Sequence, residues 1–287
     1  MPARPGRPLR DIVDDCSSDH RAWLKPTREA YLRSTLTMSV LSSQLHMAKS
    51  KISELLSGRL YPRWDQLASL AAALSIPTVP LYRLWMQAAP AIRLKTPTTW
   101  NQERTPTTQL QPPVDHTAFR ELTDDNYHFY AGVFLPDPQH RAAVRDTYDQ
   151  LWLSWNQALA SADIRRYAWD VLRTTVMRRT PHIDNRPQFG HTAFDTVAMT
   201  RLNRPDHAQS AVEQFTETQN LYRAMSRLPA SQLDVMVLRS LGGLDEEAVS
   251  SLLGVPLASV RSDERYATQV LARLLRCPPP HSEGNRS

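Results

Sequence analysis

The residues of this chain that could do the most specific chemistry form a short basic stretch at positions 49–54. A helix predicted over residues 48–56 places its polar side chains on one face, which holds Lys49, Ser50, Lys51, Ser53 and Glu54. The opposite face holds the apolar residues Ala48, Ile52, Leu55 and Leu56. Lysine ammonium groups bind phosphate oxygens, and short polar side chains hydrogen-bond to base edges in a DNA groove. The stretch is therefore predicted to bind nucleic acid.

Patterns that would indicate catalysis or metal binding are absent from the sequence. His182 and His191 flank a proline-containing loop without a cysteine or a close carboxylate, so they do not predict a metal site. Cys16 and Cys277 lie far apart and indicate neither a disulfide framework nor a thiolate zinc site. There is no glycine-rich phosphate loop, nucleophile elbow or HExxH motif. We predict a protein that is not an enzyme and that has no cofactor and no metal.

Two short helices are predicted to position the basic stretch. Thr37 is suited to cap the first helix, and residues 46–47 fit a tight turn before the second. The apolar residues of the first helix are Val40, Leu41 and Leu45. Gly58 can adopt the left-handed conformation that ends the second helix. Two short helices, a tight turn and a basic second helix are the components of a helix-turn-helix.

This region resembles the lambda-repressor-like (Xre) helix-turn-helix domains of bacteria. The matching features are Leu36, Thr37, Leu41, Leu45, the run 49–53, residues 56–58 and Pro62. In that family the second helix enters the major groove, so the resemblance places nearest the bases Lys49, Ser50, Lys51 and Glu54. The other DNA-binding candidates that it implies are Thr37, Ser39, Ser53, Arg59 and Arg63, with both arginines near phosphates. The chain departs from the family pattern at Thr35, Met38 and His46.

Further helices complete the predicted N-terminal domain. They are expected over residues 65–74 and 81–88, and within residues 18–33 with a restart at Thr27 after Pro26. Trp64 and Trp85 are expected in the core of this domain. The predicted fold is all-α and multidomain, with two helix-turn-helix units joined by a proline-rich linker and a helical middle segment.

Proline-rich stretches that lack helical periodicity indicate where the domains begin and end. The predicted divisions are a disordered N-terminus (1–17), the Xre-like domain (18–90), a Pro/Thr/Gln linker (91–114), a helical middle domain (115–204), a second helix-turn-helix domain (205–276) and a disordered tail (277–287).

The middle segment contains two predicted helices, over residues 139–160 and 163–179. They weakly resemble the ends of the polymerase-binding domain of extracytoplasmic-function sigma factors, with Tyr148 and the run 167–172 as the matching positions. A plain helical hairpin is the alternative, because the spacing between these positions is short. Residues 115–137 are acidic and aromatic, and their pattern indicates no particular element.

The C-terminal segment shows a second helix-turn-helix pattern. Helices are expected over residues 213–227, 231–241 and 245–253 and from Ser259 onward, with Asp245 and Ser259 as N-caps. The segment resembles the promoter −35-reading domain of sigma factors, through residues 228–229, 237–239, 252–255 and 259–261. The resemblance implies DNA contacts by Ser259, Arg261 and Arg265. Asp263 and Glu264 are expected close to the phosphate backbone, where they would weaken binding.

Charge is distributed unevenly along the 287 residues, which carry a net charge of +5. Residues 1–95 hold 14 Lys and Arg against 7 Asp and Glu, whereas residues 205–287 hold 8 against 10. The positive charge thus lies with the first motif, as phosphate binding requires, and less strongly with the middle segment over residues 140–204. No apolar run is long enough to span a membrane, and the expected location is the cytoplasm, in association with the nucleoid.

These observations predict a sequence-specific DNA-binding transcriptional regulator whose partner is double-stranded DNA. RNA polymerase and a second copy of the chain are further candidate partners. Two alternatives stay open from the sequence. One is a divergent extracytoplasmic-function sigma factor that recruits RNA polymerase. The other is a protein-protein interaction module built from sigma-like helices, which the acidic residues Asp263 and Glu264 favour.

Overall fold

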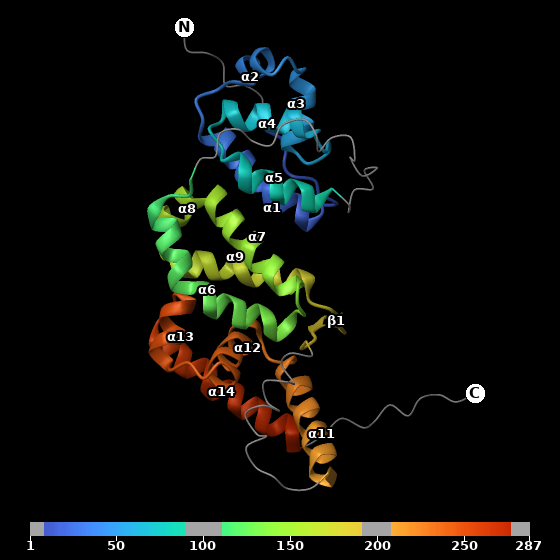
Figure 1. Ribbon diagram of the computed structural model, residues 1–287, viewed down its shortest axis with the longest axis vertical. Coiled ribbons are helices and arrows are strands. Elements are labelled where there is room, and N and C mark those ends of the chain that lie inside the picture. The colour runs from blue at the N-terminus through green and yellow to red at the C-terminus, as the bar shows by residue number, and fades with distance from the viewer. Residues whose placement is uncertain (1–8, 90–110, 191–207, 277–287) are drawn as a thin grey trace, which may run out of the picture. The chain divides into compact units, whose positions relative to one another are not determined.

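The computed structural model describes residues 9–89, 111–190 and 208–276, and within these ranges the fold is all-α apart from one small hairpin (Figure 1). The described residues form two compact units. The first unit contains the residues up to 120 together with 145–159. The second unit contains residues 121–144 together with those from 160 onward. The predicted linker falls mainly, and the predicted tail entirely, outside the described residues.

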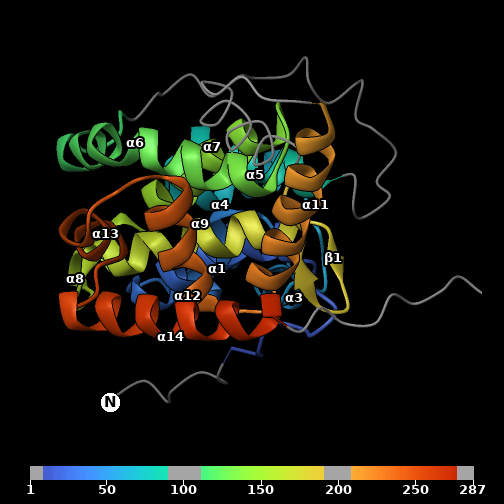
Figure 2. The ribbon, with the colours of Figure 1, turned by 90° about the horizontal axis from the view of Figure 1, so that it is seen from below.

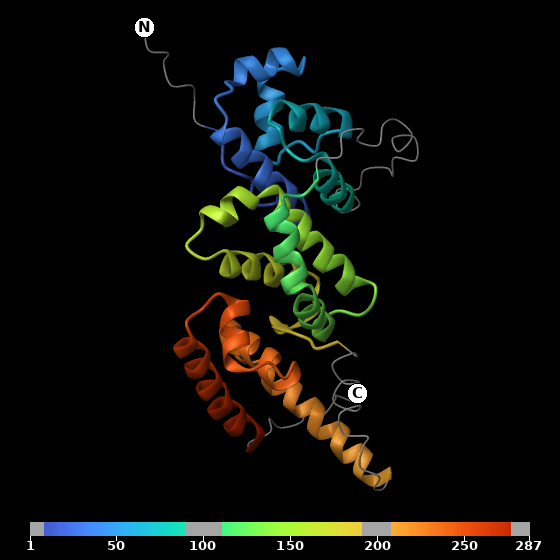
Figure 3. The ribbon, with the colours of Figure 1, turned by 60° about the vertical axis from the view of Figure 1, so that its left-hand side comes forward.

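Five helices form the N-terminal part of the first unit, drawn from blue to cyan in Figure 3. They are α1 (Ser18–Arg33), α2 (Met38–Gln44), α3 (Lys49–Leu56), α4 (Trp64–Ala73) and α5 (Thr78–Ala88). Their shared core includes Trp23, Leu24, Leu41, Ile52, Leu56, Leu67, Leu81 and Trp85, all almost completely buried. Trp64 also lies in this core, as predicted.

Helix α1 continues through Pro26 and does not restart at Thr27, contrary to the prediction. Trp23 and Leu24 before the proline and Thr27 after it are all fully buried in the same core. Packing on both sides therefore holds the helix together where a proline in isolation would interrupt it. The Thr27 hydroxyl also donates to the carbonyl of Trp23 at 2.8 Å.

The prediction of disorder is wrong for residues 9–17, which lie against the N-terminal core. Leu9, Ile12 and Val13 pack on this core, and Cys16 is buried in it. The guanidinium of Arg21 donates to the backbone carbonyls of Val13, Asp14 and Cys16. The proline- and arginine-rich composition of residues 1–17 predicted disorder. The apolar residues in the second half of this segment anchor it to the core instead.

Residues 145–159 belong to the first unit and come from two helices, α7 (Gln139–Leu153) and α8 (Trp155–Ala160). The sequence predicted a single helix here, but Ser154 separates the two, and its hydroxyl donates to the carbonyl of Gln150 at 2.8 Å. Leu153 joins the N-terminal core. Arg83 on α5 pairs with Asp149 on α7 at 3.0 Å. The predicted middle domain is thus divided between the two units.

The second unit contains most of the remaining helices, shown from another direction in Figure 2. Helix α6 (Val114–Phe134) occupies the segment that the sequence left unassigned, and its first residues belong to the first unit. The others are α9 (Ile164–Arg179), α11 (Ala208–Met225), α12 (Ala230–Met236), α13 (Glu246–Leu253) and α14 (Leu257–Arg276). Strands β1 (His182–Ile183) and β2 (Arg186–Pro187) pair antiparallel. A π-helical turn, η2 (Val237–Leu241), extends α12.

Candidate nucleic-acid interface

Helices α2 and α3 form a helix-turn-helix whose turn is fixed by side chains. The Thr37 hydroxyl caps α2 by accepting a hydrogen bond from the backbone N–H of Val40 at 3.3 Å. The Ser42 hydroxyl donates to the carbonyl of Met47 at 2.7 Å, which closes the turn from the other side. His46, in the turn, has a φ of 49°. The left-handed conformation that the turn requires is therefore adopted here by a residue with a full side chain.

Helix α3 turns its apolar face inward and its polar face outward. Ile52, Leu55 and Leu56 are buried. The exposed residues of the predicted interface are Lys49, Ser50, Lys51 and Glu54, and Ser53 is half-buried. Neither lysine forms an ion pair with any residue that the structure describes. Both ammonium groups are therefore available to an anionic partner.

The placement of Ala48 on the apolar face of the second helix was wrong, and Val40 on the first helix is not buried either. Ala48 is exposed because it is the N-cap of α3 and not part of the buried face. Val40 is 42% exposed on α2, where Leu41 alone is fully buried. Met38 and Leu45 also pack against the core and are partly buried.

The other predicted contacts of the first motif differ in how available they are. Ser39 and Arg59 are exposed. Thr37 is exposed too, and its hydroxyl accepts the capping bond of α2 while its O–H can still donate. Arg63 forms an ion pair with Asp65 at 3.5 Å, with both side chains largely exposed. This pair involves Nε of Arg63, and an exposed pair of this kind contributes little to stability.

Helices α13 and α14 form a second motif that reproduces the first one position by position. Asp245 caps α13 by accepting from the N–H of Ala248 at 2.7 Å, as predicted and as Thr37 does for α2. The Ser250 hydroxyl donates to the carbonyl of Val255 at 2.7 Å, as Ser42 does to Met47. Gly254, with a φ of 61°, occupies the turn position of His46.

The correspondence between the two motifs extends to their cores and to their second helices. The paired positions are Thr37 with Asp245, Leu41 with Val249, Ser42 with Ser250, His46 with Gly254, Met47 with Val255 and Ile52 with Val260. Leu41, Val249, Ile52 and Val260 are all fully buried. The Ala48 carbonyl accepts from Lys51 and Ile52, and the Pro256 carbonyl accepts from Ser259 and Val260. Ser259 is therefore inside the first turn of α14, and its assignment as N-cap was wrong.

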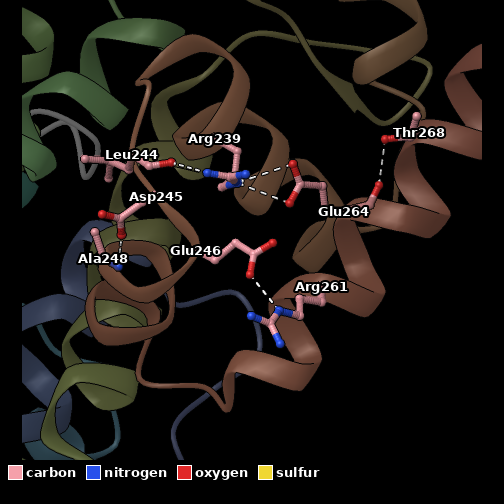
Figure 4. A network of polar contacts seen from close by, with 8 residues as sticks. All are labelled: Arg239, Leu244, Asp245, Glu246, Ala248, Arg261, Glu264 and Thr268. Atoms are coloured by element: carbon pink, nitrogen blue, oxygen red, sulfur yellow. Dashed lines mark hydrogen bonds and ion pairs between the residues drawn. The ribbon is translucent and has the colours of Figure 1, made fainter.

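Charged side chains of the second motif are paired within the domain (Figure 4). Arg261 on α14 donates to Glu246 on α13 at 2.6 Å. Glu264 accepts from Arg239 at 3.1 and 3.3 Å, and the same guanidinium donates to the carbonyl of Leu244. Glu264 therefore pairs with η2 through a side chain that is 29% exposed, and its expected position near a phosphate backbone stays a prediction. Arg265 is exposed and lies over the ring of Tyr266 at 5.1 Å.

A buried carboxylate that the sequence did not single out anchors the second motif. Asp234 on α12 is 4% exposed. It accepts hydrogen bonds from the Tyr130 hydroxyl at 2.7 Å, from Trp169 Nε1 at 3.1 Å and from Arg173 Nε at 2.9 and 3.1 Å. Burial raises the pKa of Asp234, and the Arg173 guanidinium opposes that rise. Three donors on α6 and α9 thus converge on one side chain of α12.

Comparison with known proteins identifies the second motif. The family described as Sigma-70, region 4, matches residues 218–263, from within α11 to the first half of α14. The chain therefore carries a sigma-factor-like helix-turn-helix of the DNA-binding type in its C-terminal part, which confirms the prediction for that part. No curated protein and no solved structure matched the chain. Within the described ranges, no helix is long and apolar enough to cross a membrane.

Proposed function

We propose that this protein is a sequence-specific DNA-binding transcriptional regulator in which the α2–α3 motif reads the DNA and is of the lambda-repressor-like (Xre) type. One observation carries the proposal. The α2–α3 motif matches the α13–α14 motif, which belongs to a DNA-binding family, at the cap, the serine contact, the turn and the buried positions. It adds Lys49 and Lys51, both exposed and without ion pairs among the described residues.

The proposed mechanism places α3 in the major groove with its first turn against the bases. Lys49, Ser50, Lys51 and Glu54 would lie nearest the bases, where each good bidentate contact to a base edge discriminates by about 1–3 kcal/mol, and the two lysine ammonium groups would also pair with phosphates. Ser39 and Arg59 would bind phosphates and supply salt-sensitive affinity. A protein with this function acts in the cytoplasm at the nucleoid.

The experiment that tests this proposal is selection of bound duplexes from a random-sequence pool by the full chain. We expect enrichment of one sequence, and its loss in the variant Lys49→Ala with Lys51→Ala. The matched control is Lys25→Ala, which removes an exposed lysine from α1 of the same domain. Failure of any sequence to be enriched, or equal enrichment by the double variant, would contradict the proposal. A palindromic site would further indicate that the chain binds as a dimer.

A sigma factor that recruits RNA polymerase is the second candidate, because the matched family is a region of sigma-70 factors. A pull-down of core RNA polymerase with the full chain, followed by initiation from the selected sequence, separates the two. Stable capture of the core enzyme together with promoter-dependent initiation would favour the sigma factor. Binding of the selected DNA without capture of polymerase would favour the regulator.

A further inference from the structure

The turn of the α13–α14 motif lies directly against the first turn of α9. A Cβ atom placed on Gly254 would lie 2.3 Å from the backbone nitrogen of Arg166 and 2.7 Å from Oδ1 of Asp163. Distances this short to backbone atoms cannot be relieved by a side-chain rotation. Arg165 on α9 also donates a hydrogen bond to the Ser251 hydroxyl on α13 at 2.7 Å.

The first motif shows that the turn geometry alone does not require glycine at this position. His46, which corresponds to Gly254, adopts the same left-handed conformation with a complete side chain that is exposed to solvent. What distinguishes Gly254 is the close approach of α9. The absence of a side chain at position 254 therefore allows α9 to contact the motif, in addition to allowing the left-handed turn.

The contact covers the end of the motif that meets DNA. In helix-turn-helix proteins the N-terminal residues of the second helix contact base edges. Leu257, the first residue of α14, lines an open cavity of about 490 Å³ together with Asp163 and Arg165 of α9. The major groove is about 12 Å wide, and a helix with its side chains is about 10–12 Å across. A groove that holds the start of α14 has no space for the first turn of α9 beside it.

The charge of this cavity also disfavours DNA. Asp163, which caps α9 by accepting from the N–H groups of Arg165 and Arg166, lines it, and so does Glu247 of α13. Both carboxylates would repel the phosphate backbone of a duplex docked on α14, and the Arg165 side chain in the same lining offsets one of the two negative charges. The lining keeps a net negative charge, which agrees with the steric argument.

We infer that the first turn of α9, residues 163–166, is an intramolecular cover on the α13–α14 motif and competes with DNA for it. The motif binds DNA only after α9 has moved away from residues 254–257. The inference rests on the proposed DNA-binding function and adds to it a closed state of the second motif.

The test compares Gly254→Ala with Gly243→Ala in the full chain that also carries Lys49→Ala and Lys51→Ala. Both glycines have positive φ, at 61° and 66°, so both substitutions strain the backbone alike. Only Gly254→Ala collides with α9, because nothing lies within 4 Å of a Cβ at Gly243. The probe is a labelled pool of random-sequence duplexes at low salt. Hydrogen exchange of residues 163–170 reports whether α9 has opened.

We expect Gly254→Ala to raise the exchange of residues 163–170 and to tighten DNA binding by about tenfold. DNA affinity rises about tenfold when the open state of the motif, populated in about a tenth of molecules, becomes the dominant state. Gly243→Ala should do neither. A second variant, Arg165→Ala, loses the bond to Ser251 on an exposed side chain. Arg165→Ala should also tighten DNA binding, although the loss of a positive charge by itself would weaken it.

Two results would overturn the inference. Opening of α9 in Gly254→Ala without tighter DNA binding would show that α9 does not compete with DNA. Unchanged exchange in both Gly254→Ala and Arg165→Ala would show that the contact is not closed as described. Failure of the proposed function has a different signature, because it would appear as unaltered DNA binding when Lys49 and Lys51 are replaced in the otherwise natural chain.

Discussion

The two helix-turn-helix motifs share one scaffold and differ in what occupies it. Each has an N-cap, a serine that bonds the turn carbonyl, a left-handed turn residue and a buried residue in each helix. At the start of the second helix the first motif has Lys49, Ser50 and Lys51, where the other has Leu257, Ala258 and Ser259. The scaffold residues therefore determine the fold, and the residues at the start of the second helix determine how well it can bind an anion.

The surroundings of the two motifs differ in a second way. Each domain is tied to a middle helix by a buried aspartate and an arginine. Asp149 has the half-exposed Arg83 as its partner, whereas Asp234 has three converging donors. The buried aspartate beside the second motif thus has more hydrogen-bond donors among the described residues than the one beside the first motif. Four changes test this contrast, from the largest expected effect to the smallest.

The variant Asp234→Ala should have the largest effect on stability. It leaves the Arg173 guanidinium and the Tyr130 and Trp169 donors without their buried acceptor, and breaking such a buried ion pair costs about 3–5 kcal/mol. Hydrogen exchange in α12 and α13 should rise accordingly, with α2 and α3 unchanged. The exposed Asp125→Ala on α6 is the control. Equal effects of the two variants would show that Asp234 is not an anchor.

The pH dependence of the first unit should reveal Asp149. Burial raises the pKa of Asp149 from 3.8 to about 6, although Arg83 opposes the rise. The folded state therefore holds this proton more tightly than the unfolded state. Its contribution to stability is present in full below about pH 4 and is lost as the pH rises through about 6. The loss amounts to about 3 kcal/mol at most.

Denaturant unfolding of the wild type and of Asp149→Asn, measured across this pH range, isolates the contribution of this carboxyl group. The free energy of unfolding of the wild type should decline relative to that of the variant. Parallel curves for the two proteins would show that Asp149 is better solvated than its 4% exposure indicates.

The capping residues should give the smallest differences. Asp245→Ala removes a charged cap with a 2.7 Å hydrogen bond, and Thr37→Ala removes a neutral cap with a 3.3 Å bond. Replacement of an N-cap by alanine costs about 1 kcal/mol, and a carboxylate also interacts favourably with the helix dipole. We expect Asp245→Ala to cost more than Thr37→Ala in thermal unfolding. The opposite order would show that hydrogen-bond length does not rank these caps.

The sequence predicted those parts of the fold that depend on local signals. The caps at Thr37 and Asp245, the end of α3 at Gly58 and the helices α2, α3 and α13 follow from short-range patterns. Ser259 was misassigned because the chain after Pro256 already enters the helix, so a suitable capping residue was placed one turn too late.

Features that depend on distant partners were not predictable from the sequence. Helix α6 was missed because Tyr127, Tyr130 and Phe134 are buried alongside acidic residues, which obscures an apolar stripe. In the sequence, Asp149 and Asp234 resemble exposed helix residues. Their partners, Arg83 and Arg173, lie on other helices and come close only in the folded chain. The exposed lysines of α3 were predictable from the sequence. The ion pairs of Arg261 with Glu246 and of Glu264 with Arg239 were not.

The most direct test of the contrast between the motifs is a salt titration of DNA binding with two double variants. The DNA is a labelled duplex of the sequence selected by the full chain, and the variants are Lys49→Ala with Lys51→Ala and Arg261→Ala with Arg265→Ala. The lysine pair should weaken binding and reduce the salt slope by about one unit for each phosphate contact removed, whereas the arginine pair should change neither. A reduced slope with the arginine pair and an unchanged slope with the lysine pair would contradict the assignment of DNA recognition to α3.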